Sequence, residues 1–214
     1  MQDHQEQHQE QQWLDWVEQL RAIAQNGLAY ADGQFDIERY HQLQSIAHDM
    51  TAQLSGAPRS KVDQYFVGEN GYTTPKLDIR AGVFRDDKIL LVKERSDGCW
   101  ALPGGWADVC ESPALGAERE TLEESGYIVK AVKLVAVRDT LRHPYHPRNA
   151  HHLLKLLFLC ELQGGEAKEN IEISEIDFFE VNQLPTLSRG RTIAEDIALM
   201  VKHKDHPDLA TEFD

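Results

Sequence analysis

The spacing of apolar residues changes character once along this chain of 214 residues, and that change limits the available folds. Between Trp13 and Leu54 apolar residues recur every three or four positions, the pattern of amphipathic helices. From Leu77 onward short segments alternate apolar and polar residues, as half-buried strands do. The sequence therefore predicts four parts: a helical extension over residues 1–58, a linker over 59–76, an α/β domain over 77–205 and a tail over 206–214.

Two helices are expected in the N-terminal extension. The first fades after Gly27, and the second has Asp36 as its expected N-cap. Residues 1–11 are Gln-rich, lack periodicity and are predicted to be disordered. Because a pair of short helices buries too little apolar surface to be stable alone, it should pack on a second copy of the chain or on the rest of this one.

The domain over residues 77–205 mixes strands and helices in an α/β or α+β arrangement. Strands are expected at 77–84, 88–93, 128–138, 153–162 and 177–181. One helix is bracketed by Ser112 as N-cap, Pro113 at its first position and Gly126 just past its end. A last helix is expected over 192–201.

The charge balance excludes some partners. With 22 basic and 36 acidic residues the net charge is −14, so tight binding of long nucleic acid, which requires many Lys and Arg contacts, is not expected. An acidic protein that handles phosphates needs a metal ion to do so. From residue 108 to residue 126 the chain holds six acidic residues against one basic residue, which concentrates part of this charge in one place.

Other features bear on location. No apolar run approaches the roughly 18 residues of a membrane span, and the first residues, MQDHQEQHQEQQ, lack the basic and apolar regions of a signal peptide. The three cysteines, Cys99, Cys110 and Cys160, are odd in number and lack CxxC spacing, which supports neither a disulfide framework nor a zinc knuckle. The sequence predicts a cytoplasmic protein that does not associate with membranes.

Three glutamates share one face of the helix predicted at residues 113–125. Glu120, Glu123 and Glu124 lie opposite Leu115 and Leu122 on a helical wheel. Like charges at this spacing destabilise an isolated helix by a few tenths of a kcal/mol per pair, approximately, so the cluster suggests a use for the repulsion. Carboxylates are ligands that Mg²⁺ prefers. The alternative is an acid-rich solvent face, since Glu is a good helix former.

The loop before this helix extends the pattern. Gly105, five residues, Glu111, seven residues and then RETLEESGY at 119–127 resemble the Nudix box, G-x5-E-x7-REUxEExGU, where U is a bulky aliphatic residue. Every charged and glycine position is present, and Thr121 and Tyr127 stand at the two U positions. The resemblance covers residues 77–202. It implies the Nudix fold, a mixed sheet between helices, and Mg²⁺- or Mn²⁺-dependent hydrolysis of a nucleoside diphosphate linked to another group.

The resemblance also implies roles for particular residues. The implied metal ligands are Glu120, Glu124, Glu123 and the carbonyl of Gly104. The implied catalytic residues are Arg119, Glu120, Glu123 and Glu172. In this interpretation Arg119 orients the carboxylates, and Glu123 shares the metal or takes the proton of the attacking water. Glu111 is expected to brace the loop, and an additional acid is expected at Glu172 or Glu175.

Substrate contacts are expected outside the box, at Arg95, Tyr145 and Arg148. The segment 143–152, HPYHPRNAHH, either lines the site, with Tyr145 stacking on a base, or is a polar turn between two strands. A zinc site there is disfavoured because no Cys or carboxylate spacing completes it. Trp100 and Trp106 are expected to anchor the glycine loop.

Residues 13–50 resemble the helical extension of a bacterial Nudix subgroup that includes CDP-choline pyrophosphatases, members of which often carry the name ADP-ribose pyrophosphatase. The resemblance implies a small nucleotide substrate and a homodimer that uses the N-terminal helices; packing within one chain is the alternative. Processing of RNA ends, or nucleotide sensing without cleavage, are alternative functions. A sensor would be expected to lose box carboxylates or to carry a basic DNA-binding domain, and neither is evident.

Overall fold

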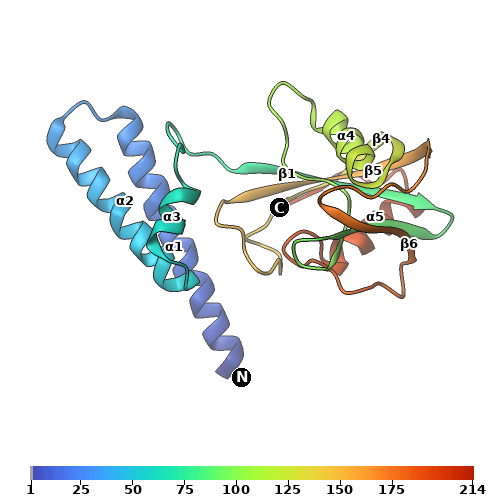
Figure 1. Cartoon of the computed structure of the whole chain (residues 1–214), viewed down its shortest axis with the longest axis horizontal. Helices are drawn as coiled ribbons and strands as arrows, with labels where there is room; N and C mark the ends of the chain where they lie inside the picture. The colour runs from blue at the N-terminus through green and yellow to red at the C-terminus, as the bar shows by residue number, and fades with distance from the viewer. Residues whose placement is uncertain (1) are drawn as a thin grey trace. The chain divides into compact units, whose positions relative to one another are not determined.

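The computed structural model describes the backbone of residues 2–214 and the side chains from Gln12 onward (Figure 1). The chain divides into two compact units with the boundary between Thr74 and Pro75. The prediction of disorder for residues 1–11 falls on residues whose side chains lie outside those described, and it stays a prediction. Among the described residues no helix is long and apolar enough to cross a membrane.

The N-terminal unit is helical. Its helices are α1 (Gln2–Tyr30), α2 (Gln34–Ser55) and α3 (Arg59–Tyr65). Val17 and Ala24 of α1 and Ala47 of α2 are buried, as the apolar periodicity predicts. The N-cap of α2 is Gly33 rather than Asp36, because the Gly33 carbonyl accepts the first helical hydrogen bonds.

The segment predicted as a linker, residues 59–76, contains the helix α3. Pro58 stands at its N-cap position with an extended backbone, which is compatible with a helix start. Within α3 only Val62 is buried, so the helix has too little apolar periodicity to be read from the sequence.

The C-terminal unit is a mixed sheet with two helices. Its elements are β1 (Lys76–Arg85), β2 (Lys88–Glu94), β3 (Trp100–Ala101), α4 (Pro113–Ser125), β4 (Tyr127–Asp139), β5 (Leu153–Gly165), β6 (Ile173–Glu180), α5 (Ala194–Asp205) and β7 (Glu212–Phe213). The strand order is β3-β2-β1-β5-β4-β7, and β6 also pairs with β2. The β1–β5 and β4–β7 pairs are parallel and the other pairs antiparallel.

The helices α4 and α5 cover opposite faces of the sheet (Figure 1). Neighbouring residues of a strand point to opposite faces, and β5 shows the result. Leu157 belongs to a core cluster with Ile197 and Met200 of α5, whereas Phe158 belongs to a second cluster with Ala117 of α4.

The predicted fold class and the five predicted strands are confirmed, with ends shifted by a few residues. The capping of α4 is also confirmed: the Ser112 hydroxyl accepts from the Leu115 amide at 3.3 Å, and Gly126 has a positive φ of 78°.

The tail predicted for residues 206–214 is instead held along β4. Its strand β7 pairs with Ala136 and Val137, and the Lys133 ammonium donates to the carbonyls of Pro207 and Leu209, each at 2.6 Å. With only two residues each, β3 and β7 are too short to show any alternation in the sequence.

Candidate active site

The glycine loop before α4 runs beside β1. The Ile79 amide donates to the Gly105 carbonyl at 2.8 Å, and the Ala81 amide donates to the Pro103 carbonyl at 2.9 Å. Gly104 has a φ of 140°, and a Cβ there would lie 2.0 Å from the Ile79 carbonyl oxygen. Only glycine fits at this position, so the close pairing of loop and strand depends on it.

Glu124 reaches from α4 to this loop. Its carboxylate accepts a hydrogen bond from the Gly104 amide at 2.8 Å, and the residue is only 7% exposed. Burial raises the pKa of Glu124 to about 8, although the positive charge of the buried Arg80 acts to lower it. A bound cation would relieve the cost of ionising this group.

Glu120 lies one helical turn before Glu124 and faces Gly105, where a Cβ would be 3.2 Å from its carboxylate. Burial raises the pKa of Glu120, against the opposing charge of Arg119. Two partly or fully buried carboxylates therefore meet the backbone of the glycine loop at one place.

Arg119 lies among the acids of the box. Its guanidinium donates to Glu120 at 2.9 Å and to Glu123 at 3.0 Å, and it binds Glu111 through both Nε and Nη2. The hydrogen bonds that Arg119 donates to Glu111 are the main reason why the pKa of Arg119 is raised. Glu111 is thus bound to Arg119, and its bracing role stays a prediction.

The donors around Gly104 suit Mg²⁺ or Mn²⁺. Glu120 and Glu124 meet the glycine loop, and their carboxylates and the Gly104 carbonyl are oxygen donors of the kind that hard divalent cations prefer. Among the hydrogen bonds of the described residues, none uses the Gly104 carbonyl. Among the described side chains no group of three or more acids, His or Cys is arranged to hold a metal ion. Arg119 binds the carboxylates of Glu120 and Glu123. Because Mg²⁺ commonly takes only one or two carboxylates and completes its coordination with waters, a cluster of three side chains is not required.

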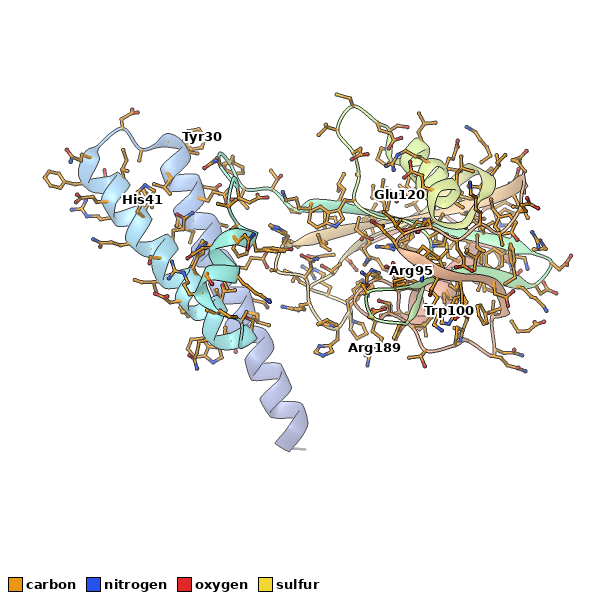
Figure 2. The ribbon with its side chains drawn as sticks, viewed as in Figure 1. Tyr30, His41, Arg95, Trp100, Glu120 and Arg189 are labelled. Carbon is orange, nitrogen blue, oxygen red and sulfur yellow. The ribbon has the colours of Figure 1, made fainter. Side chains whose placement is uncertain are left out.

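The loop after β5 brings Arg95 and Glu172 together near the end of α4. The Arg95 amide donates to the Glu172 carbonyl at 2.8 Å, and its guanidinium pairs with Glu169 at 3.2 Å. The Asn170 side chain donates to the Glu123 carbonyl at 2.7 Å, which ties this loop to the box helix. Arg95 and Glu120 are labelled in Figure 2, where Glu120 lies on the helix α4. Glu175, the alternative acid, pairs with Lys93 at 2.7 Å.

The placement of Tyr145 does not agree with base stacking. Its ring is only 4% exposed, Lys155 lies 5.0 Å from the ring centroid, and its hydroxyl donates to Asp196 at 2.7 Å. An aromatic ring needs an exposed face to stack on a base, and this ring is part of the interior. Arg148 is half-buried and donates to the Leu141 carbonyl at 3.3 Å.

The two tryptophans that flank the glycine loop differ in environment. Trp100 is buried in the core beside Phe179, as expected of an anchor. Trp106 is 44% exposed, and the ring of His151 packs edge-on against it at 5.7 Å.

Sequence reasoning missed a buried ionic group behind the loop. Asp78 accepts from the Arg80 guanidinium at 2.9 and 2.8 Å and from the Lys155 ammonium at 2.8 Å. In the sequence this group is indicated by Lys155, a charged residue inside the apolar run LLKLLFL. Glu94, at the end of β2, was missed as well: it is 8% exposed, pairs with Arg191 at 3.2 Å, and burial raises its pKa.

Comparison with protein families agrees with this geometry. A model described as "NUDIX domain" matches residues 76–199. The chain therefore belongs to the Nudix hydrolases, and its C-terminal unit is a Nudix pyrophosphohydrolase domain. A second model, described as "UDP-X-like, N-terminal oligomerisation domain", matches residues 11–66.

Individual relatives share both parts. A Bacillus subtilis (strain 168) protein named "Putative ADP-ribose pyrophosphatase YjhB" is 38% identical over 202 residues, which cover 94% of this chain and 97% of that protein. A solved structure of a UDP-X diphosphatase is 33% identical, with a TM-score of 0.61 and coverage of 96% of this chain and 99% of the other. A solved ADP-ribose pyrophosphatase from Streptococcus suis is 42% identical, with a TM-score of 0.60; it aligns over its whole length with 66% of this chain.

Proposed function

We propose that this Nudix enzyme uses Mg²⁺ or Mn²⁺ to hydrolyse the pyrophosphate bond of a nucleoside diphosphate linked to a second group, of the ADP-ribose or CDP-choline type. The observation that carries the proposal is the meeting of Glu120 and Glu124 with the glycine-loop backbone at Gly104. The names of the relatives, ADP-ribose pyrophosphatase and UDP-X diphosphatase, support this class of substrate.

In the proposed mechanism Glu120, Glu124 and the Gly104 carbonyl hold the cation, with Glu123 able to share it. The cation supplies the charge that neutralises phosphate oxygens and makes a bound water acidic. Arg119 fixes the directions of the Glu120 and Glu123 carboxylates. Glu123, whose side chain is 58% exposed, takes the proton of the attacking water. The leaving phosphate is a good leaving group, so positioning and charge provide most of the rate.

Two residues outside the box complete the proposal. Arg95 lies next to Glu172 through the backbone hydrogen bond between them, at the end of β2 and beside the loop that Asn170 ties to the box helix. We assign Arg95 to a substrate phosphate and Glu172 to the role of an additional acid. Arg148 stays a proposed substrate contact. Tyr145 is not proposed as one, because its ring is buried.

A substrate panel tests the activity. With Mg²⁺ or Mn²⁺ the protein is expected to release nucleoside monophosphate from ADP-ribose or CDP-choline, and EDTA should abolish the reaction. NADH, diadenosine polyphosphates and capped RNA complete the panel. Glu120→Gln controls for contaminating phosphatases, because it should retain the fold and lose the activity. Hydrolysis of capped RNA alone would favour RNA-end processing, and binding without any hydrolysis would favour a sensor.

We also propose a homodimer formed through the N-terminal unit, whose matching family model is described as an oligomerisation domain. Ile23 on α1 and Ile46 on α2 are 55% and 54% exposed, which leaves apolar surface for a partner. Light scattering at micromolar concentration is expected to give twice the mass of the chain. Ile46→Glu should shift the protein toward monomer, whereas Gln163→Glu, at an exposed position of β5 in the C-terminal unit, should not. A monomeric wild type would contradict the proposal.

The cytoplasmic location also stays a prediction.

A further inference from the structure

Both backbone polar groups of Leu102, the residue that opens the glycine loop, are bound by side chains from distant parts of the chain. The Thr192 hydroxyl oxygen accepts from the Leu102 amide at 3.0 Å, and the Arg80 guanidinium donates to the Leu102 carbonyl at 3.1 Å. Leu102 and Thr192 have no exposed surface, and Arg80 is 4% exposed. Side chains that bind a buried peptide from two sides fix its position, because losing either bond leaves a polar group unsatisfied.

The Arg80 side is rigid because of the ionic group described above. Asp78 holds two nitrogens of the guanidinium, and Lys155 holds the same carboxylate at 2.8 Å. The planar fork of an arginine that is bound bidentately has little freedom left, so its third donor reaches Leu102 in a fixed direction.

The Thr192 side is rigid as well. The Thr192 amide donates to the Ser188 carbonyl at 2.8 Å, and the Ser188 amide donates to the Trp100 carbonyl at 2.8 Å. The segment before α5 therefore runs beside β3, two residues ahead of Leu102. Its hydroxyl is presented to the loop from a backbone that is itself paired.

Leu102 is two residues from Gly104, whose amide binds Glu124 and whose carbonyl is a proposed metal ligand. We propose that Arg80 and Thr192 are positioning residues of the active site: they fix the Leu102 peptide and thereby place Gly104 against the cation. The inference rests on the proposed metal-dependent function. Neither side chain is among the proposed ligands, and each acts through the loop. Displacements below 1 Å in such a support are enough to weaken a site.

The matched pair Thr192→Val and Thr192→Ser tests this. Valine has nearly the same shape but cannot accept from the Leu102 amide, whereas serine can. The measurements are the Mn²⁺ dissociation constant of the nucleotide-free protein by calorimetry, together with kcat and KM on the best panel substrate. Thr192→Val is expected to weaken Mn²⁺ binding about tenfold and to lower kcat by a similar factor, with KM little changed. Thr192→Ser should return both values to within about twofold of wild type.

Circular dichroism establishes that the variants are folded. If Thr192→Val does not fold, Thr192→Cys replaces it, because the cysteine sulfur is similar in size to the hydroxyl and is only a weak acceptor. Thr192→Cys is expected to lose part of the Mn²⁺ affinity that Thr192→Val would lose. Mn²⁺ binding and kcat at wild-type levels in folded Thr192→Val or Thr192→Cys would overturn the positioning role and leave the proposed function intact. A wild type that neither binds Mn²⁺ nor hydrolyses any compound of the panel would instead overturn the proposed function.

Discussion

Replacing Glu124 by Gln is expected to reduce pyrophosphatase activity by about a hundredfold or more and, in the metal-free protein, to increase thermal stability at alkaline pH. The first effect follows from the loss of a charged ligand at the proposed metal site. The second follows from burial, because glutamine can still accept from the Gly104 amide but carries no charge that the interior disfavours.

The pH dependence has a definite sign. Folded Glu124 keeps its proton to about pH 8, whereas its ordinary pKa is 4.5. Between these values the unfolded chain is ionised and the folded protein is not, so ionisation of Glu124 costs stability increasingly as the pH rises through this range. Since a tenfold change in proton affinity corresponds to about 1.4 kcal/mol, the full cost above pH 8 is on the order of a few kcal/mol.

The measurement is thermal unfolding in EDTA at pH 5 and at pH 9. Glu124→Gln should melt roughly 5 °C or more above wild type at pH 9 and close to it at pH 5. Adding Mn²⁺ should raise the midpoint of wild type but not of the variant. Glu161→Gln, which neutralises an exposed carboxylate on β5, is the control and should change neither activity nor midpoint. A variant that retains full activity would remove Glu124 from the metal site.

Asp78→Asn is expected to cause the largest loss of stability. Burial tends to raise the pKa of Asp78, but the charges of Arg80 and Lys155 outweigh it and lower that pKa to about 2. An amide would leave two buried cations without their counter-charge, which costs about 3–5 kcal/mol. Thermal midpoints at pH 7 should therefore fall by roughly 10 °C. The contribution of Asp78 is present at neutral pH and is lost as the pH falls below 3.8 toward 2.

A surface ion pair provides the matched control. Asp87 binds Lys204 at 2.9 Å, but its side chain is 89% exposed, so Asp87→Asn should leave the thermal midpoint nearly unchanged. If Asp78→Asn melted at the same temperature as Asp87→Asn, the ionic group behind the glycine loop would not have the energetic importance that we assign to it.

The sequence predicts the elements of the domain well where one side of an element is apolar and its ends carry turn residues. Its alternation locates β1, β2, β4 and β5. The apolar pattern does not predict α3, which buries a single valine. It also does not predict β3 and β7, whose pairing depends on residues far away in the chain. Within the site, the acids of α4 follow from spacing along one helix.

The supports of the site could not be predicted in the same way. Asp78 and Arg80 stand at alternate positions of a strand, where charged residues usually face solvent. Only the parallel pairing of β1 with β5 reveals that Lys155 lies beside Asp78 and binds its carboxylate. Thr192 is 90 residues from its partner Leu102. Tyr145 looked like a surface residue in a His-rich segment, but its hydroxyl finds Asp196 in the interior.

The short strand β7 has a consequence for how this protein behaves at high concentration. Without it, the thirteen residues of β4 would form the open edge of the sheet, and a long open edge recruits strands of other molecules. Pairing of Glu212 and Phe213 with Ala136 and Val137 covers the part of that edge near the C-terminal end of β4. The register shifts between β4 and β5 are irregularities of the kind that bend a strand, and a bent β4 is a poorer template for pairing than a flat one. Pairing with β7 thus leaves a shorter stretch of β4 open to the strands of other molecules.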